Sequence, residues 1–187
     1  MPPLTPAQFA ALLPHLRPRA AAGRPVADLR ARMDAIFHLV STTLPWRCLP
    51  PGYGKPDTVA RHFRRLTHAG LWEGLLHALK DSGPNDPLRE IAPRIFRACR
   101  RAVRLRGLGF VALIRRLGFL EALNGPPTKV PDPDLSEKLR RRLRLPPLPS
   151  GAAAHGPYRA FLRALCRLHR RAGGVKKIPR ALRLGWS

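Results

Sequence analysis

Residues 58–80, TVARHFRRLTHAGLWEGLLHALK, predict two consecutive helices with a glycine between them. The first has an apolar stripe at helical spacing, formed by Val59, Phe63 and Leu66. Asp57 or Thr58 is suited to cap the start of this helix, and Gly70 is suited to end it. The second helix carries a broader apolar face, made of Leu71, Trp72, Leu75, Leu76 and Leu79.

Upstream of this pair, the sequence predicts two more helices separated by loops. Thr5 can cap a short helix that ends near Pro14, and residues 17–26 form a loop of Pro, Gly and Arg. Asp28 can cap a helix whose apolar face is Leu29, Met33, Ile36, Phe37 and Val40. That helix ends in the segment LPWRCLPPGYGKP, residues 44–56, because four prolines and two glycines prevent it from continuing.

Downstream, DSGPNDP at residues 81–87 is typical of a linker, so we expect a domain boundary there, between residues 5–80 and 81–187. The second region predicts a basic helix from about Leu88 to Arg106 and a helical segment over 110–123. A charged segment at 135–145 and a helix at 158–174 follow. We expect the tail, 175–187, to be loose, and the whole region to be either a basic helical domain or a degenerate, partly disordered one.

The residue composition favours an all-α fold. The chain has only seven Val and five Ile, whereas Leu, Ala and Arg are abundant. We therefore expect a small N-terminal helical bundle followed by basic helices and loose segments rich in Pro and Gly.

Positive charge is the strongest compositional signal. The 187 residues contain 35 Lys and Arg against 11 Asp and Glu, a net charge of +24, and only six of the cations are Lys. Arginine binds phosphate and guanine in a forked geometry, so this excess favours a nucleic-acid partner. The alternative is that a GC-rich genome inflates Arg, Ala, Pro, Leu and Gly without selection for binding. Residues 1–80 have 11 basic and 4 acidic residues, and residues 81–187 have 24 and 7.

Three widely spaced cysteines, Cys48, Cys99 and Cys166, suggest neither a disulfide framework nor a cysteine zinc site. The apolar run at the N-terminus is too short for a signal peptide, and no 18 apolar residues occur together. We therefore expect a bacterial cytoplasmic protein.

An ordered set of positions in the first half is similar to the short N-terminal domain of many DDE-type insertion-sequence transposases. These positions are Arg24-Pro25, Asp28-Leu29-Arg30, Asp34-Ala35-Ile36-Phe37, Pro45-Trp46-Arg47-x-Leu49-Pro50, Thr58-Val59, Phe63-Arg64-Arg65, Gly70 and Trp72-Glu73. The sequence departs from the family pattern at Gly54-Lys55-Pro56-Asp57 and at Leu66, where the family usually has aromatic residues. The resemblance covers about residues 5–80 and implies a helix-turn-helix-like module that recognises the terminal inverted repeats of an insertion sequence.

The proline-rich segment at residues 44–56 forms an elbow in the predicted module. We expect the helix that follows this elbow to face DNA. Arg61, His62, Arg64 and Arg65 are predicted to point away from the apolar stripe, with Thr58 at the start of the helix. Arg47 and Lys55 on the elbow would contact phosphates. The alternative for any single arginine is that it only solvates a helix surface. Trp46 and Trp72 are expected in the core, and His38, His68 and His77 are expected to bind no metal.

We expect no catalytic residues, metal or cofactor in this chain. Transposases of this class use three carboxylates on a β-sheet to hold two metal ions, and no β-branched run precedes any acid after residue 80. Asp132 and Asp134 around Pro133 suit a turn and helix cap better than a metal site. Cys166 and His169, one helical turn apart, have no further ligands nearby in sequence.

Three functions remain open from the sequence. The first is a noncatalytic DNA-binding protein, a truncated or accessory transposase associated with the nucleoid. The second is one part of an active transposase whose catalytic domain is on another chain or reading frame. The third is a membrane-surface protein that uses helices such as 88–106, although Arg101, Arg104 and Arg106 are not clearly segregated from the apolar face. A homodimer would suit inverted repeats, but no heptad seam is visible.

Overall fold

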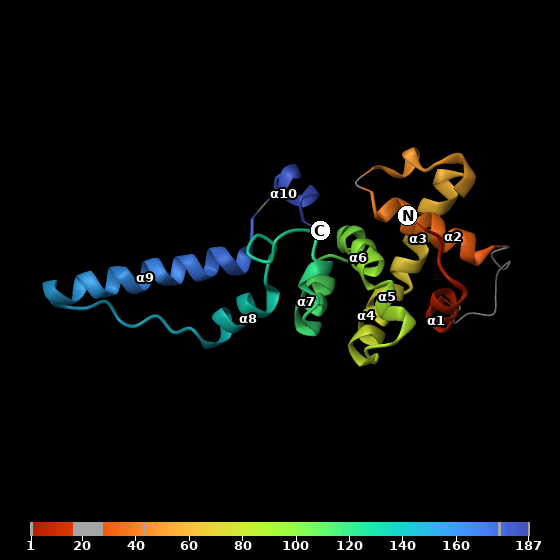
Figure 1. Ribbon diagram of the computed structural model, residues 1–187. Coiled ribbons are helices and arrows are strands. Elements are labelled where there is room, and N and C mark those ends of the chain that lie inside the picture. Colours follow the sequence, from red (N-terminus) through yellow and green to blue (C-terminus); the bar gives the residue numbers. More distant parts are fainter. Residues whose placement is uncertain (1, 17–27, 43, 176, 187) are drawn as a thin grey trace. The chain divides into compact units, whose positions relative to one another are not determined.

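The computed structural model describes residues 2–16, 28–42, 44–175 and 177–186. Within these residues every regular element is a helix and there is no strand, which confirms the predicted all-α class (Figure 1). Contacts between Cα atoms divide the chain into two compact units, Met1–Asn124 and Gly125–Ser187. We call them unit 1 and unit 2 and describe each by itself.

Unit 1 contains seven α-helices and three 3-10 turns among its described residues. In chain order they are α1 (Pro6–Leu16), α2 (Leu29–Val40), η1 (Trp46–Cys48), η2 (Pro51–Tyr53), α3 (Pro56–His68), α4 (Leu71–Asp81), α5 (Pro87–Glu90), α6 (Ala92–Arg106), α7 (Leu108–Leu117) and η3 (Leu120–Ala122).

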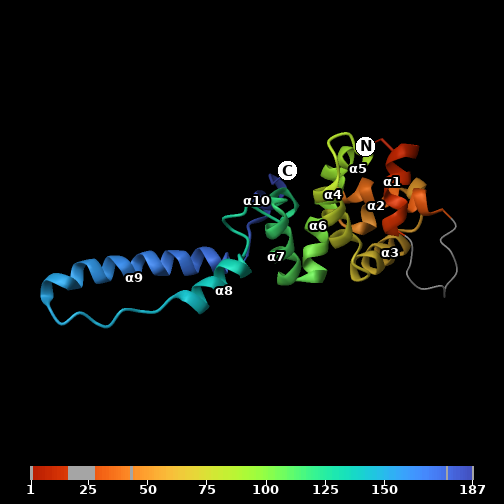
Figure 2. The same cartoon turned by 90° about the horizontal axis from the view of Figure 1, so that it is seen from below.

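Helix α6 lies at the centre of unit 1. It packs against α2, α3, α4 and α7, and Figures 1 and 2 show it beside these helices from two directions. Its inward face is fully buried and combines small and larger side chains, at Ile95, Ala98, Cys99 and Ala102. Small residues on this face allow the neighbouring helices to approach closely.

The domain boundary predicted after residue 80 lies inside unit 1, because the two units divide after Asn124.

The N-terminal segment is attached to α2 by hydrogen bonds. The Leu4 amide donates to Asp34 over 2.7 Å, and the Arg30 guanidinium donates to the Leu4 carbonyl. Thr5 and Gln8 exchange side-chain and backbone hydrogen bonds at the start of α1, in the arrangement of a capping box. Helix α1 ends at Leu16, close to the end predicted near Pro14, and Pro14 lies inside its last turn. The missing N–H of Pro14 costs only one hydrogen bond near the helix terminus.

Two downstream predictions need correction in unit 1. The single helix predicted over 88–106 is split at Ile91 into α5 and α6, because Pro93 is tolerated only in the first turn of a helix. The helical segment predicted over 110–123 ends earlier, at Leu117, because Gly118 adopts a left-handed conformation with φ of 84°.

Unit 2 consists of α8 (Pro133–Arg142), α9 (Ala152–Gly173) and α10 (Arg180–Leu184). Helix α8 packs against α9, and the connecting segment runs along α9, where the Tyr158 hydroxyl donates to the Pro146 carbonyl (Figures 1 and 2). The Asp132 side chain caps α8 by accepting from the Leu135 amide, as expected for a helix cap. Helix α9 begins six residues before the predicted start, and α10 lies in the tail that was predicted to be loose.

Gly174 joins the end of α9 to the start of unit 2. Its φ is 66°, and a Cβ there would lie 2.6 Å from the Pro131 nitrogen and 2.8 Å from the Lys129 carbonyl oxygen. The adjacent Val175 amide donates to that same carbonyl. Any larger residue would therefore force the backbone apart at this contact.

Trp72 and Thr67 allow a test of the core between α3 and α4. Both are fully buried, and the Trp72 indole N–H donates to the Thr67 hydroxyl over 2.8 Å. We expect Thr67→Val to lower the free energy of unfolding by about 1–3 kcal/mol, because it leaves the indole N–H without a partner. In a Trp72→Phe background the same change should cost about 1 kcal/mol less, measured by urea denaturation. If Thr67→Val and Trp72→Phe together lower the free energy of unfolding by the sum of their separate effects, this account is contradicted.

Candidate nucleic-acid interface

Helix α3 follows the proline-rich elbow directly. Its N-cap is Lys55, whose side chain makes no capping hydrogen bond, and Pro56 is its first residue. The cap predicted at Asp57 or Thr58 is therefore wrong, because proline at the first helical position starts the helix earlier. At the other end, the helix turns into α4 through Gly70, whose φ of 81° is left-handed. That part of the prediction is confirmed.

The two faces of α3 differ sharply in burial. Its inward face, buried among α2, α4 and α6, includes Val59, Ala60, Phe63 and Thr67. Its outward face is exposed and carries Asp57, Thr58, Arg61, Arg64, Arg65 and His68. The helix therefore presents three arginines to solvent with a single acid, in the first turn. Leu66, predicted to be part of the inward stripe, is only half-buried.

A hollow of about 450 Å³ lies against the outward face of α3. The described residues that line it are Thr58, Arg61, Arg64 and Arg65. All four were predicted site residues, and the fold brings them to one place. These guanidinium groups and the hydroxyl supply hydrogen-bond donors to an anionic group, and Asp57, the one acid of α3, is not among the described residues that line the hollow.

His62 does not belong to this exposed face. Only 6% of its surface is accessible, so the expectation that it points outward is wrong. Its Nδ1 lies 3.4 Å from an Arg65 guanidinium nitrogen, and its Nε2 has no hydrogen-bond partner within the described residues. Burial, followed by the charges of Arg65 and Arg32, lowers the pKa of His62 from 6.5 to about 4. A neutral imidazole is therefore part of the packing of α3.

The elbow before α3 is held by aromatic contacts. Trp46 in η1 lies 5.2 Å from Phe63, and Phe63 lies 5.5 Å from Trp72, measured between ring centroids. Arg47 and Lys55 are exposed on this segment and are not among the described residues that line the hollow. Trp72 is fully buried and Trp46 half-buried, in agreement with their predicted places in the core.

Residues 4–76 match the family described as "Putative transposase of IS4/5 family (DUF4096)". The match extends from the residue before the α1 capping box to the middle of α4 and confirms the transposase resemblance predicted for residues 5–80. Arg24 and Pro25, which contributed to that resemblance, lie outside the described residues. No curated protein and no solved structure matches the chain.

We call residues 4–76 the transposase-like segment. Arg101 joins this segment to α6, which follows the matched residues in the sequence. Its guanidinium is 5.2 Å from the Trp46 ring centroid and donates to the carbonyls of Thr42 and Leu44, over 3.2 and 2.5 Å. It also reaches the Leu39 carbonyl at the end of α2. Burial, with a smaller effect of the Arg104 charge, lowers its pKa. The sequence pattern groups Arg101 with Arg104 and Arg106 as cations that are not clearly segregated from an apolar face, and only its position opposite Trp46 and the end of α2 distinguishes it.

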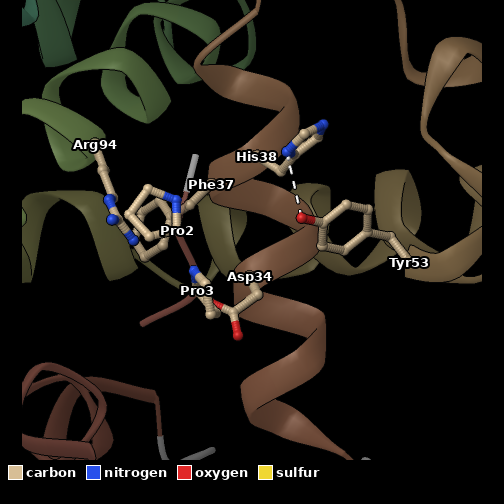
Figure 3. Close-up of a pocket in the computed structure, with 7 residues that line it drawn as sticks. All are labelled: Pro2, Pro3, Asp34, Phe37, His38, Tyr53 and Arg94. Carbon is tan, nitrogen blue, oxygen red and sulfur yellow. Dashed lines mark hydrogen bonds between the residues drawn. The ribbon is translucent and has the colours of Figure 1, made fainter. Parts of the chain in front are cut away.

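A second, much smaller cavity of about 10 Å³ lies where the N-terminal prolines meet α2 (Figure 3). There, His38 and Tyr53 stack with centroids 4.6 Å apart, and the Tyr53 hydroxyl lies 3.3 Å from His38 Nδ1. The cavity has room for about one water molecule, so we interpret it as a packing feature that joins η2 to α2.

No three His, Cys, Asp or Glu side chains in the described part of the chain lie close enough together to hold a metal ion. None of the described helices is long and apolar enough to cross a lipid bilayer.

Replacing Arg101 tests its role in holding the elbow. Arg101→Met keeps the aliphatic stem but removes the donors to three carbonyls and the charge above Trp46. We expect the free energy of unfolding to fall by about 1.5–3 kcal/mol. The matched control, Arg104→Met, changes an exposed cation one turn away and should cost less than about 0.5 kcal/mol. Equal losses in thermal or urea unfolding would show that Arg101 has no special role.

Buried His62 predicts a specific dependence of stability on pH. As the pH falls from about 6.5 to about 4, the unfolded chain protonates this imidazole while the folded chain does not. The free energy of unfolding should therefore fall over this range, by on the order of 1–3 kcal/mol for this group. Urea denaturation at several pH values should show a shallower fall for His62→Gln than for the unaltered chain. Identical pH dependence in the two proteins would contradict the burial of a neutral His62.

Proposed function

We propose that this chain binds duplex DNA through the outward face of α3 and recognises the terminal inverted repeats of an insertion sequence. The observation that carries the proposal is the hollow on α3, lined by Thr58, Arg61, Arg64 and Arg65, within the segment that matches the transposase family. Because this chain resembles a transposase family and exposes a basic helix within the matching segment, that helix can bind DNA.

The geometry of α3 suits the major groove, which admits an α-helix. Arg61 and Arg65 are four residues apart, so they lie on one face, and Arg64 lies beside them. Arginine donates two parallel hydrogen bonds to O6 and N7 of guanine, the commonest specific contact in protein–DNA complexes. Thr58, at the start of the helix, has a hydroxyl that suits a phosphate or a base edge.

The elbow supplies the remaining contacts in this proposal. Arg47 and Lys55 are exposed on the segment that leads into α3 and would neutralise phosphates beside the groove. Such contacts position the helix on the duplex without reading its sequence. In this function the chain is an accessory or truncated transposase that binds the ends of the element. The alternative is that it is one part of an active transposase whose catalytic domain is on another chain or reading frame.

The test is a gel-shift titration on the terminal repeat beside the gene and on scrambled duplex of equal length, at two salt concentrations. We expect the unaltered chain to prefer the repeat. Arg61→Ala with Arg65→Ala should reduce that preference by about 5- to 150-fold per lost bidentate contact, from the 1–3 kcal/mol that each contributes.

The matched control removes two charges from other helices of unit 1, with Lys80→Ala and Arg104→Ala, both exposed. It should weaken binding to both duplexes alike and leave the preference unchanged. An equal affinity of the unaltered chain for both duplexes would contradict sequence recognition by α3. A loss of preference in the control as large as in the α3 variant would contradict its assignment to this face.

A further inference from the structure

Helix α9 carries a row of arginines along one side. They are Arg159, Arg163, Arg167, Arg170 and Arg171, and all five are exposed. The first four are spaced by four, four and three residues, and Arg171 lies four residues after Arg167, which places the five on one face, over twelve residues or about 18 Å of helix. The helix contains no acidic residue, and none of the five makes an ion pair within the described part of the chain. We call these residues the α9 arginine row.

The opposite side of α9 is apolar and faces the rest of unit 2. Leu165 and Ala172 are buried there, and the Ala172 carbonyl accepts from the Asp132 amide at the start of α8. Phe161 and Leu168 continue the same side with partial exposure. Because this side packs against α8, the arginine row is turned to solvent.

We propose that the α9 arginine row is a second DNA-contacting surface, one that binds the phosphate backbone of a duplex without regard to sequence. Arg159, Arg163, Arg167 and Arg171 follow one another every four residues, about 6 Å apart along the helix axis, which allows each to reach a separate phosphate. The five arginines make no ion pair with an acid in the described part of the chain, so DNA binding would not have to break one. Each phosphate that they neutralise releases counterions, so the affinity rises as salt falls.

The arginines of α8 differ in this respect. Arg140 and Arg141 both bind Glu137, over 2.8 and 2.5 Å, and these bonds lower the pKa of Glu137 to about 2. Two of the cations of α8 are therefore already partnered inside unit 2. The α9 row is the larger set of exposed cations without acidic partners in the described part of this unit.

A nucleic acid fits the α9 row better than a membrane surface does. A helix that lies in a lipid interface buries its apolar side in the bilayer while its cations contact the headgroups beside it. In α9 the two buried apolar residues, Leu165 and Ala172, lie opposite the arginines and are already packed inside unit 2, while Phe161 and Leu168 are 38% and 42% exposed. The row also lacks lysine, and the forked guanidinium suits phosphate.

The experiment measures the salt dependence of binding to scrambled duplex with the full chain. In the test variant, Arg163→Gln, Arg167→Gln and Arg170→Gln remove three cations from the row. If each contacts a phosphate, the slope of log affinity against log salt should become shallower by about 3, and the Kd near 0.1 M salt should rise by about tenfold to a few hundredfold. Arg→Lys at the same three positions should keep most of the slope, because the charge remains.

The matched control removes three cations elsewhere in unit 2, with Lys138→Gln, Arg142→Gln and Arg144→Gln, all exposed. Circular dichroism shows whether each variant keeps its helices. A change of slope in the control as large as in the test variant would overturn the assignment to α9, and so would an unchanged slope in the test variant. A test variant that keeps duplex binding but loses binding to phosphatidylserine vesicles would assign the row to a membrane instead.

This inference stands apart from the proposed role of α3. The change of salt slope between the unaltered chain and the α9 variant on scrambled duplex reports the α9 row, whereas the ratio of affinities for repeat and scrambled duplex reports α3. Failure of one proposal therefore leaves the readout of the other intact.

Discussion

The contact between Trp46 and Phe63 is the constraint on which the geometry of unit 1 depends. Trp46 lies in the elbow, Phe63 lies on the inward side of α3, and Trp72 follows in α4 with its indole bonded to Thr67. These rings fix the rotation of α3 about its axis. Because Phe63 must point inward to meet both tryptophans, Arg61, Arg64 and Arg65 must point outward.

Arg101 extends that constraint to the part of unit 1 beyond the family match. It joins the end of α2, the elbow and the Trp46 ring to α6, the helix at the centre of the unit. Because α6 and α7 follow residue 80, the transposase-like segment does not complete its own core. The fold therefore makes the position of the candidate interface depend on residues outside the segment that resembles the transposase family.

Local signals in the sequence predicted most of the helices and four residues of the hollow. Asp28 caps α2, Gly70 separates α3 from α4, and the spacing of Val59 and Phe63 gives the inward side of α3. His62 was misplaced because it lies at the border of the two faces of α3, where tertiary packing that the sequence pattern does not encode buries it. The role of Arg101 depends on contacts with residues some sixty positions away, which no local pattern in the sequence encodes.

The most direct test of the central claim is chemical modification of arginine in the full chain with and without duplex, read out by mass spectrometry after phenylglyoxal treatment. We expect the duplex to protect Arg61, Arg64 and Arg65, while exposed Arg104 in the same unit stays reactive. If the three arginines of α3 react as readily as Arg104 in the presence of saturating duplex, then α3 is not the DNA-facing helix and the account is contradicted.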